Sequence, residues 1–352
     1  MTSAVAAARK RPTPPAIKLA GGALRLLGAV ALTFFGLLLV TFLIGRVVPI
    51  DPVLAAVGDR APVEVYQRVR TELGLDQPLY VQFYRYAAAV LSGDFGRSVL
   101  TSNPVLTDIK RFFPATFELA TLATLIGVAL GIPLGVMAAA RQNRFLDQII
   151  RVLGLLGYSV PVFWIGLMGL VLFYVHLDLV AGPGRLDVAY EDLVETRTGV
   201  ILLDSALAGN WGVFRNAFAH VILPASILGY FSLAYVSRMT RSLMIEQLRQ
   251  EYIVTARVKG LSEGRVIWRH ALGNVMVPLI TVVALSYANL LEGSVLTETV
   301  FAWPGIGQYI TNSLLSVDMN AVLGGTIVVG TVFVGLNLFS DLLYRVFDPR
   351  AR

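Results

Sequence analysis

The chain has 352 residues, of which 56% are hydrophobic and only 15% are charged. A soluble domain carries roughly a quarter charged residues, so this composition and a mean hydropathy of +0.69 indicate an integral membrane protein. The net charge of +6 does not indicate a nucleic-acid partner, because the basic residues lie beside apolar segments, and the absence of cysteine excludes disulfides and thiolate chemistry.

Residues 1–23 are the first unit that composition separates from the rest of the chain. Their basic residues and prolines predict a disordered, basic, cytoplasmic tail. The apolar run within residues 24–48 is too long for a signal-peptide core and lacks a convincing small-residue cleavage site. It predicts the first transmembrane helix, whose apolar part at 26–48 is long enough to cross a hydrocarbon layer about 30 Å thick.

Residues 49–113 are soluble in character. Amphipathic helices are predicted at 63–73 and 79–91, and a turn is predicted at 93–98. Each of these helices is too short to cross a bilayer. The segment is therefore predicted to be a small extracytoplasmic helical element that follows the first span.

Residues 114–347 predict a core of five further transmembrane helices. Their apolar segments lie at 117–140, 152–177, 218–236, 274–297 and 321–344. Pro133 lies inside the first of these segments, where neighbouring helices can satisfy the carbonyl that a proline leaves free. The connection at 178–216 is polar and mostly acidic, with Asp187, Glu191, Asp192, Glu195 and Asp204.

Lys and Arg residues are concentrated in alternate connections. They lie in the N-terminal tail, in residues 141–151, in residues 238–269 and at the C-terminal end, where residues 348–352 form a short tail. The positive-inside rule places all four regions in the cytoplasm. The chain is therefore predicted to cross the membrane six times, with both termini cytoplasmic.

The cytoplasmic loop at about 238–273 has its own helical pattern. Gly260 can adopt the left-handed conformation that ends a helix, and Ser262 can cap the next one. Basic charge beside an apolar stripe suits either a helix on an anionic membrane surface or a surface that docks a protein. The stripe consists of apolar side chains three or four residues apart, which predicts a single helical face: Ile245, Leu248, Tyr252 and Ala256.

The residues of this loop resemble the cytoplasmic EAA loop of ABC importer permeases, in the form found in peptide and nickel permeases. The match comprises Glu251, Tyr252, Ala256, Arg257, Lys259, Gly260 and Leu261, followed by Arg269-His270-Ala-Leu and Pro278. Residues 290–307, with Glu298, Trp303 and Gly305, are similar to a second stretch typical of the same family.

The resemblance implies an all-α type I importer permease fold in a bacterial inner membrane, with six transmembrane helices and a cytoplasmic coupling helix. It implies that the seven matched residues, 251–252, 256–257 and 259–261, couple the chain to an ATPase. The implied partners are a second permease, which is a paralogue or a second copy, two ATP-binding subunits and an extracytoplasmic binding protein. The chain would then be a pore subunit that is no enzyme and binds no cofactor. ATP and Mg²⁺ would belong to the ATPases, since no Walker A loop is present.

Two other classes of protein are alternatives to this interpretation. An ion-coupled secondary transporter would use intramembrane carboxylates, for which Glu292 and Asp341 are the candidates. An intramembrane enzyme is disfavoured, because His176, His220 and His270 have no metal-ligand spacing. Within the permease family, nickel, glutathione-like and opine-like solutes stay open beside di- and oligopeptides.

Overall fold

The computed structural model describes residues 15–47, 52–58, 60–72 and 74–347. Within these residues the structure is helical, apart from loops and one isolated antiparallel bridge between Arg97 and Pro104. The parts of the predicted tails at 1–14 and 348–352 lie outside the described residues. The helix α1 begins at Pro15, so the prediction that the tail extends to residue 23 is wrong.

Five described helical segments are long and apolar enough to cross a membrane. They belong to α1 (Pro15–Val47), α5 (Val105–Ala140), α9 (Trp211–Leu248), α12 (Leu272–Gly293) and α15 (Met319–Phe347). A sixth candidate span consists of two apolar helical arms, α6 (Phe145–Ser159) and the run of α7 (Val162–Gly169) with the π-helical η1 (Leu170–His176), which are bent by 97° to each other. The segment at 152–177, which is predicted as one transmembrane span, is therefore interrupted between Ser159 and Val162.

Pro161 explains the bend in the sixth span. A proline has no backbone N–H and disfavours helical backbone in the residue before it. Val160 is accordingly extended, with φ −101° and ψ 130°, and α7 begins directly after Pro161. A hydropathy window averages over this break, because the residues on both sides of it are apolar.

Two spans are longer than their apolar sequence predicts. Helix α5 begins at Val105 rather than at 117, and α9 covers Trp211–Leu248 rather than 218–236. Both additional parts carry charged residues, such as Asp108 in α5 and Arg241 in α9. Charged residues lower the mean hydropathy of a segment, so the predicted span stops where they begin. They do not interrupt the backbone hydrogen bonds of the helix, which therefore continues past them.

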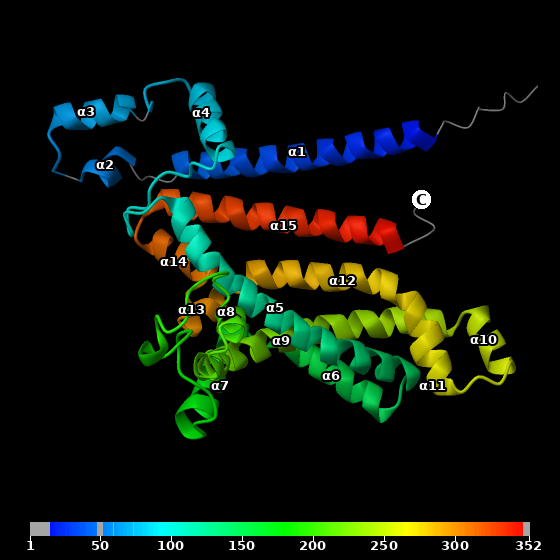
Figure 1. Cartoon of the computed structure of the whole chain (residues 1–352). Helices are drawn as coiled ribbons and strands as arrows, with labels where there is room; N and C mark the ends of the chain where they lie inside the picture. Colours follow the sequence, from blue (N-terminus) through cyan, green and yellow to red (C-terminus); the bar gives the residue numbers. More distant parts are fainter. Residues whose placement is uncertain (1–14, 48–51, 59, 73, 348–352) are drawn as a thin grey trace, which may run out of the picture.

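The shorter helices gather at the two ends of the molecule (Figure 1). One end carries α3 (Val63–Glu72) and α4 (Leu79–Leu91), which lie where two amphipathic helices are predicted. The other helices there are α2 (Pro52–Val57), α8 (Ile201–Leu207), α13 (Val295–Val300) and α14 (Ile306–Leu315). The opposite end carries α10 (Glu251–Val258), α11 (Glu263–Arg265) and the π-helical η3 (Val266–Ala271), and α15 ends toward the same end.

Helices α5 and α9 pack backbone to backbone through a stripe of glycines. Gly127, Gly131 and Gly135 are four residues apart, so they lie on one face of α5. A methyl group on Gly127 would clash with the Ser232 side chain, and one on Gly135 would lie 2.6 Å from the Ser237 carbonyl oxygen. Small residues allow membrane helices to approach closely, so this stripe sets the distance between the two longest spans.

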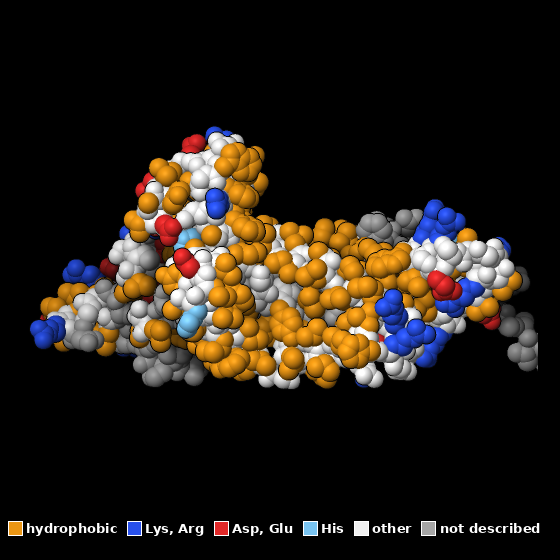
Figure 2. Space-filling view, turned by 90° about the horizontal axis from the view of Figure 1, so that it is seen from below, with side chains coloured by type: hydrophobic (Ala, Val, Ile, Leu, Met, Phe, Trp, Pro, Cys, Tyr) orange, Lys and Arg blue, Asp and Glu red, His pale blue; other side chains and the backbone are white. Residues whose placement is uncertain are grey.

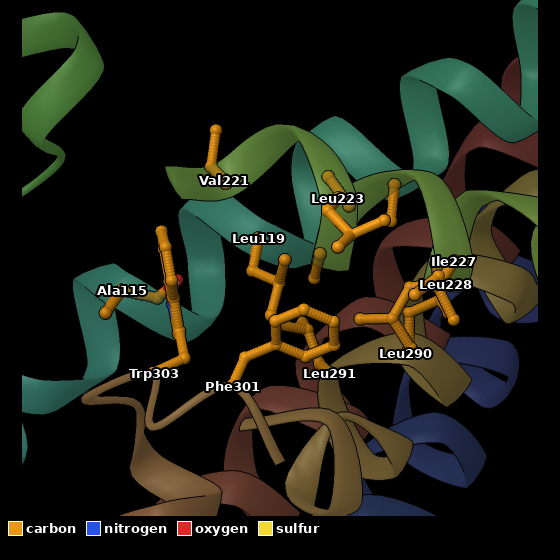
Figure 3. Packing of buried hydrophobic residues seen from close by; sticks show 13 residues of the cluster. Ala115, Leu119, Val221, Leu223, Ile227, Leu228, Leu290, Leu291, Phe301 and Trp303 are labelled. Atoms are coloured by element: carbon orange, nitrogen blue, oxygen red, sulfur yellow. The ribbon is translucent and has the colours of Figure 1, made fainter. Parts of the chain in front are cut away.

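A buried apolar cluster fills the space between the spans at the end that carries α13 and α14. Buried side chains of α5, α9 and α12 meet Phe301 and Trp303, which extend from their loop toward α5 and α9 (Figure 3). Trp303 is almost fully buried, and its indole Nε1–H donates a hydrogen bond of 2.9 Å to the Ala115 carbonyl. The aromatic loop is thereby fixed to the first turns of the apolar part of α5.

Candidate functional site

The loop between α9 and α12 is the part of the chain that the sequence singles out most strongly. It folds as α10, a corner at residues 259–262, and a helical run from Glu263 through η3 into α12. The prediction of one helical face through Ile245 and Tyr252 is wrong, because α9 ends at Leu248 and α10 begins at Glu251. Gln250 between them is extended, with φ −76° and ψ 150°.

The break changes which side chains of α10 are buried. Ile253 is fully buried and Ala256 is nearly so, whereas Tyr252 is 36% exposed and donates a hydrogen bond to the Gln247 side chain. Ile253 and Ala256 are one turn apart and belong to an apolar cluster at the base of the loop. The cluster also contains buried residues of α5, α9, η3 and α12: Val136, Ala139, Met244, Val266, Ala271, Val275, Leu279 and Val282.

Gly260 ends α10 in the left-handed conformation that the sequence predicts, with φ +78°. The Leu261 N–H donates to the Ala256 carbonyl at 3.3 Å, and the Gly260 N–H donates to the Arg257 carbonyl at 2.9 Å. These two bonds define a Schellman motif, and Leu261 packs against the cluster that contains Ala256. The corner therefore has one defined geometry.

Ser262 stands at the N-terminal cap position of α11, but its side chain makes no capping hydrogen bond. The prediction is thus right about the position and wrong about the bond. The nearby polar contact is an ion pair between Arg257 and Glu263, with Nε 2.8 Å from Oε1. This pair crosses the corner on its exposed side.

The outward face of α10 is mixed in character. Val254 and Val258 are 54% and 83% exposed, and they lie one turn apart. Glu251 and Lys259 are exposed beside them. Figure 2 shows that Lys and Arg side chains gather at this end of the molecule, beyond a broad apolar belt. The described residues of the chain thus leave Val254 and Val258 largely exposed.

Residues 290–307 fold around Glu298, whose side chain is fully buried. Its carboxylate accepts hydrogen bonds from the Thr116 hydroxyl at 2.6 Å, the Ser294 hydroxyl at 2.9 Å and the Gln308 N–H at 2.9 Å. A side chain at Gly305 would collide with this carboxylate. Glu298 therefore joins α13 to α5 and α14, a role that its position in the sequence does not reveal.

Glu292 and Asp341 are the two carboxylates that the sequence offers as ion sites within the membrane. Glu292 is exposed at the end of α12, and the side chain of Asp341 lies outside the described residues. No group of three or more His, Cys, Asp or Glu side chains that could hold a metal ion occurs in the described part of the chain. The His220 ring lies between the Gly182 carbonyl oxygen, at 3.0 Å, and the Asp187 carboxylate, at 3.3 Å.

These features define an all-α polytopic membrane protein. Its loop between α9 and α12 carries the helix α10, which is packed against the spans through Ile253 and Ala256 and is exposed on its outward face. The family model of the binding-protein-dependent transport system inner membrane component matches residues 131–352, and the model of the N-terminal part of such components matches residues 23–120. The chain belongs to this family of inner membrane components. The predicted resemblance and the type I ABC importer permease fold are thereby confirmed.

Proteins of known name are similar over nearly the whole chain. The probable D,D-dipeptide transport system permease protein DdpB of Escherichia coli K12 is 47% identical, over 90% of this chain and 92% of that protein. The dipeptide transport system permease protein DppB of the same strain is 43% identical over 94% and 98%. The di/tripeptide transport system permease protein DppB of Pseudomonas aeruginosa UCBPP-PA14 is 41% identical over 93% and 97%. The solved MetNI methionine ABC transporter has a TM-score of 0.46 at 15% identity, over 66% of this chain and 92% of that one.

Proposed function

We propose that the chain forms half of the translocation pore of an ATP-driven importer of di- or oligopeptides. The observation that carries this proposal is the anchored and outwardly exposed helix α10 in a chain that belongs to the importer permease family. The peptide cargo is supported by the similar proteins, whose names specify dipeptide or di/tripeptide transport. A periplasmic or lipid-anchored binding protein would deliver the peptide.

Helix α10 would be the coupling helix that docks on the ATPase. The exposed Val254 and Val258 provide an apolar contact, and Glu251 and Lys259 provide charges that orient it. The Schellman corner at Gly260 and the cluster around Ile253 would transmit a displacement of α10 to α5, α9 and α12. Interiors are close-packed and poorly compressible, so a push on α10 reaches these spans rather than being absorbed locally.

The end of the molecule that carries α10 would face the cytoplasm. Lys and Arg side chains gather there, and the first residues of α1 and the last residues of α15 lie at the same end (Figures 1 and 2). Reporter fusions test this orientation at Glu195 and Arg257, which lie in loops at opposite ends. A cytoplasmic signal at Glu195, or an external signal at Arg257, would reverse it.

The complex would contain a second permease, two ATP-binding subunits and the binding protein. In this proposal the chain carries out no chemical step of its own and binds no cofactor. ATP and Mg²⁺ are held by the ATPase subunits, and the permease converts their closure into alternate opening of the pore. If the second permease is another copy of this chain, the two coupling helices that meet the ATPases are identical. If it is a paralogue, they differ in sequence.

Copurification of the ATPase tests the docking role of α10. The substitution Val258→Asp places a charge in the centre of the proposed contact, and we expect it to reduce the amount of ATPase that copurifies with the permease. Val188→Asp is the matched control, because Val188 is 82% exposed and lies in the loop at the other end of the molecule. Equal recovery of ATPase with Val258→Asp and with the unmodified chain would contradict the proposal.

The substitution Glu251→Lys separates docking on a protein from binding to lipid. If α10 docks on the ATPase, reversing this charge lowers both ATPase recovery and peptide transport. If α10 lies on the membrane surface, an added cation strengthens its binding to anionic vesicles and leaves hydrolysis coupled to transport. The second result would remove the coupling role from α10.

A further inference from the structure

Helix α4 carries an exposed apolar stripe, although it is not one of the apolar spans. Tyr80, Tyr84 and Leu91 are 75%, 74% and 80% exposed. Successive members of this set are four and seven residues apart, so all three lie on one face of the helix. Single exposed apolar side chains are normal on a protein surface, but several large ones on one helical face mark a surface that meets lipid or another protein.

The polar side chains of α4 lie on a different face from this stripe. The Gln82 carboxamide donates a hydrogen bond of 2.6 Å to the Gln77 carbonyl, and the Arg85 guanidinium lies against Gly74. Both contacts are with the turn that precedes the helix. Arg85 is also the one charged residue of α4. A polar face beside a strongly apolar face is the pattern of a helix that lies in the plane of a membrane surface.

A third side of α4 packs against the first span. The Phe83 ring makes edge-to-face contacts with the rings of Phe35 and Phe42 of α1, whose centroids are 5.8 and 5.4 Å away. The Tyr86 hydroxyl donates a hydrogen bond of 2.9 Å to the hydroxyl of the buried Thr41. All three α1 residues belong to the part of α1 that is apolar enough to cross a membrane. Helix α4 therefore lies beside this part of α1 and not beyond its end.

These contacts define the depth of α4 in the membrane. A helix rises about 1.5 Å per residue, so the 20 residues from Leu27 to Arg46 cover about 30 Å, which is the thickness of the hydrocarbon layer. Arg46 is charged and exposed, so it marks the edge of this layer. Phe42 and Thr41 precede it by four and five residues, which places them about 6–8 Å inside the edge. Interfacial helices bury their apolar face to a similar depth of about 5–10 Å.

Helix α15 contacts α4 at the same level. A small cavity of about 240 Å³ lies between them, and its lining includes Ala89 and Val90 of α4 and Leu323 and Ile327 of α15. Since α15 begins at Met319, these contacts involve its first turns. Figure 1 shows α4 lying across the direction of α1 and α15, short of the end of α1. The helix is therefore oriented along the membrane plane.

Helix α3 provides a contrast within the same connection. Figure 1 shows it beyond the end of α1. None of its residues is buried, and four of the ten are charged: Glu64, Arg68, Arg70 and Glu72. Its composition and position suit a helix in water, whereas those of α4 suit a helix at the lipid boundary.

We propose that α4 is an interfacial helix whose stripe of Tyr80, Tyr84 and Leu91 contacts phospholipid in the leaflet on the side opposite α10. Tyrosine suits this position, because its ring is apolar while its hydroxyl reaches the headgroups and water. A water-soluble binding protein would instead meet the surface beyond the end of α1, where α3 lies. The connection that the sequence predicts to be extracytoplasmic is thereby divided between a helix in water and a helix in lipid. The inference depends neither on the cargo nor on the ATPase.

Fluorescence quenching of the full chain in liposomes tests the depth of α4, and the chain has no native cysteine to interfere. A nitrobenzoxadiazole label is attached to Tyr84→Cys. The matched control is Val63→Cys, because Val63 is 71% exposed on α3. The quencher is phosphatidylcholine that carries a doxyl group on one acyl chain, close to the headgroup.

We expect this lipid to quench the label at Tyr84→Cys several-fold more strongly than the label at Val63→Cys. The emission of the label at Tyr84→Cys should also lie at shorter wavelength, because its surroundings are less polar. Equal quenching at the two positions would place both helices in water and would overturn the inference.

Photocrosslinking in the assembled complex identifies what covers the stripe. The photoreactive amino acid p-benzoylphenylalanine takes the place of Tyr84, or of Val63 in the control, and mass spectrometry identifies the adduct on this chain. We expect a phospholipid adduct at the position of Tyr84 and none at that of Val63. An adduct with the second permease or with the binding protein at the position of Tyr84 would make the stripe a protein interface. That result, or the absence of a lipid adduct there, would overturn the inference.

Discussion

Asp147 and Arg241 form a bidentate ion pair that joins α6 to α9 near the end of the molecule that carries α10. The Arg241 Nε donates to one carboxylate oxygen at 2.6 Å, and Nη2 donates to the other at 2.8 Å. The Asp147 side chain is completely buried, and its second oxygen also accepts the Asn143 N–H at 2.9 Å. A buried carboxylate depends on such donors, because a buried charge without partners is costly.

We therefore expect Arg241→Ala to lower the free energy of unfolding in detergent by about 3–5 kcal/mol, since it leaves the buried carboxylate unpaired. The double variant Asp147→Asn with Arg241→Gln should recover part of this loss, because it removes both charges together. Arg257→Ala is the control, as the Arg257–Glu263 pair is exposed and should contribute less than about 1 kcal/mol. Equal losses of stability in Arg241→Ala and Arg257→Ala would show that burial does not determine how much each ion pair contributes to the free energy of unfolding.

The glycine stripe on α5 gives a second prediction about stability. Gly135→Ala places a methyl group 2.6 Å from the Ser237 carbonyl oxygen, and this backbone atom cannot move without displacing α9. We expect a loss of about 1–3 kcal/mol, the usual cost of overpacking. Gly154→Ala on α6 is the control, because nothing lies within 4 Å of the added methyl group.

Gly154→Ala should leave stability unchanged or raise it by up to about 1 kcal/mol, because alanine is the better helix former. The two substitutions are chemically identical and both lie in helices, so their difference isolates the contact with α9. Thermal unfolding of both variants in the same detergent provides the comparison. A Gly135→Ala variant as stable as the unmodified chain would mean that α5 and α9 can separate at no cost.

The sequence was sufficient to predict five of the spans, because each of them contains an apolar segment long enough to cross a bilayer. It was also sufficient for the left-handed corner at Gly260, because few residues other than glycine adopt that conformation. The bend at Pro161 was missed, since a proline inside a span is compatible with either a kink or a break. Only the packing of the flanking segments decides between the two.

Features that depend on distant partners could not be predicted. Glu298 reads as an ordinary acidic residue after a span, and only the fold brings Thr116 and Gln308 to its carboxylate. The burial of Ile253 in place of Tyr252 follows from the break at Gln250, where no glycine or proline marks the end of α9. The glycine stripe of α5 was visible as two successive G-x-x-x-G patterns, but its partner helix was not.

Asp204 gives a prediction about acid sensitivity at the other end of the molecule. Burial would raise the pKa of this carboxyl, but hydrogen bonds from the Thr198 hydroxyl and from the N–H groups of Arg197, Thr198 and Gly199 hold the pKa below its ordinary value. A depressed pKa contributes stability that is present above the unfolded pKa, about 3.9, and is lost as the pH falls toward the folded value. The loop at 197–204 should therefore loosen below about pH 4.

Hydrogen exchange of this loop against pH measures the effect. Asp204→Asn should increase exchange at neutral pH and abolish the further increase in acid, because the titrating group is gone. Asp192→Asn is the control, since Asp192 is exposed in the same connection and its positive φ of 61° is one that asparagine tolerates. Retention of the full acid response in Asp204→Asn would assign that response to another carboxylate.

The last prediction concerns how the corner at Gly260 transmits force. Gly260→Val puts a branched side chain at a φ of +78°, which costs roughly 1–2 kcal/mol, although nothing lies within 4 Å of the added Cβ. The variant therefore disturbs only the backbone of the corner, and insertion of the spans should be normal. We expect weaker ATPase association, or hydrolysis that proceeds without transport, in vesicles that contain the assembled complex.

Two matched variants make this test specific for the left-handed backbone. Gly264→Val adds the same side chain four residues later in the same loop, at a glycine with no positive φ and no neighbour within 4 Å, and it should couple normally. Gly260→Asn should also retain most of the coupling, because asparagine tolerates the left-handed region. Transport and ATP hydrolysis are measured side by side for all three variants. Unmodified values of both for Gly260→Val would show that the corner need not be rigid, and the route from α10 to the spans would then run through Ile253 and its cluster alone.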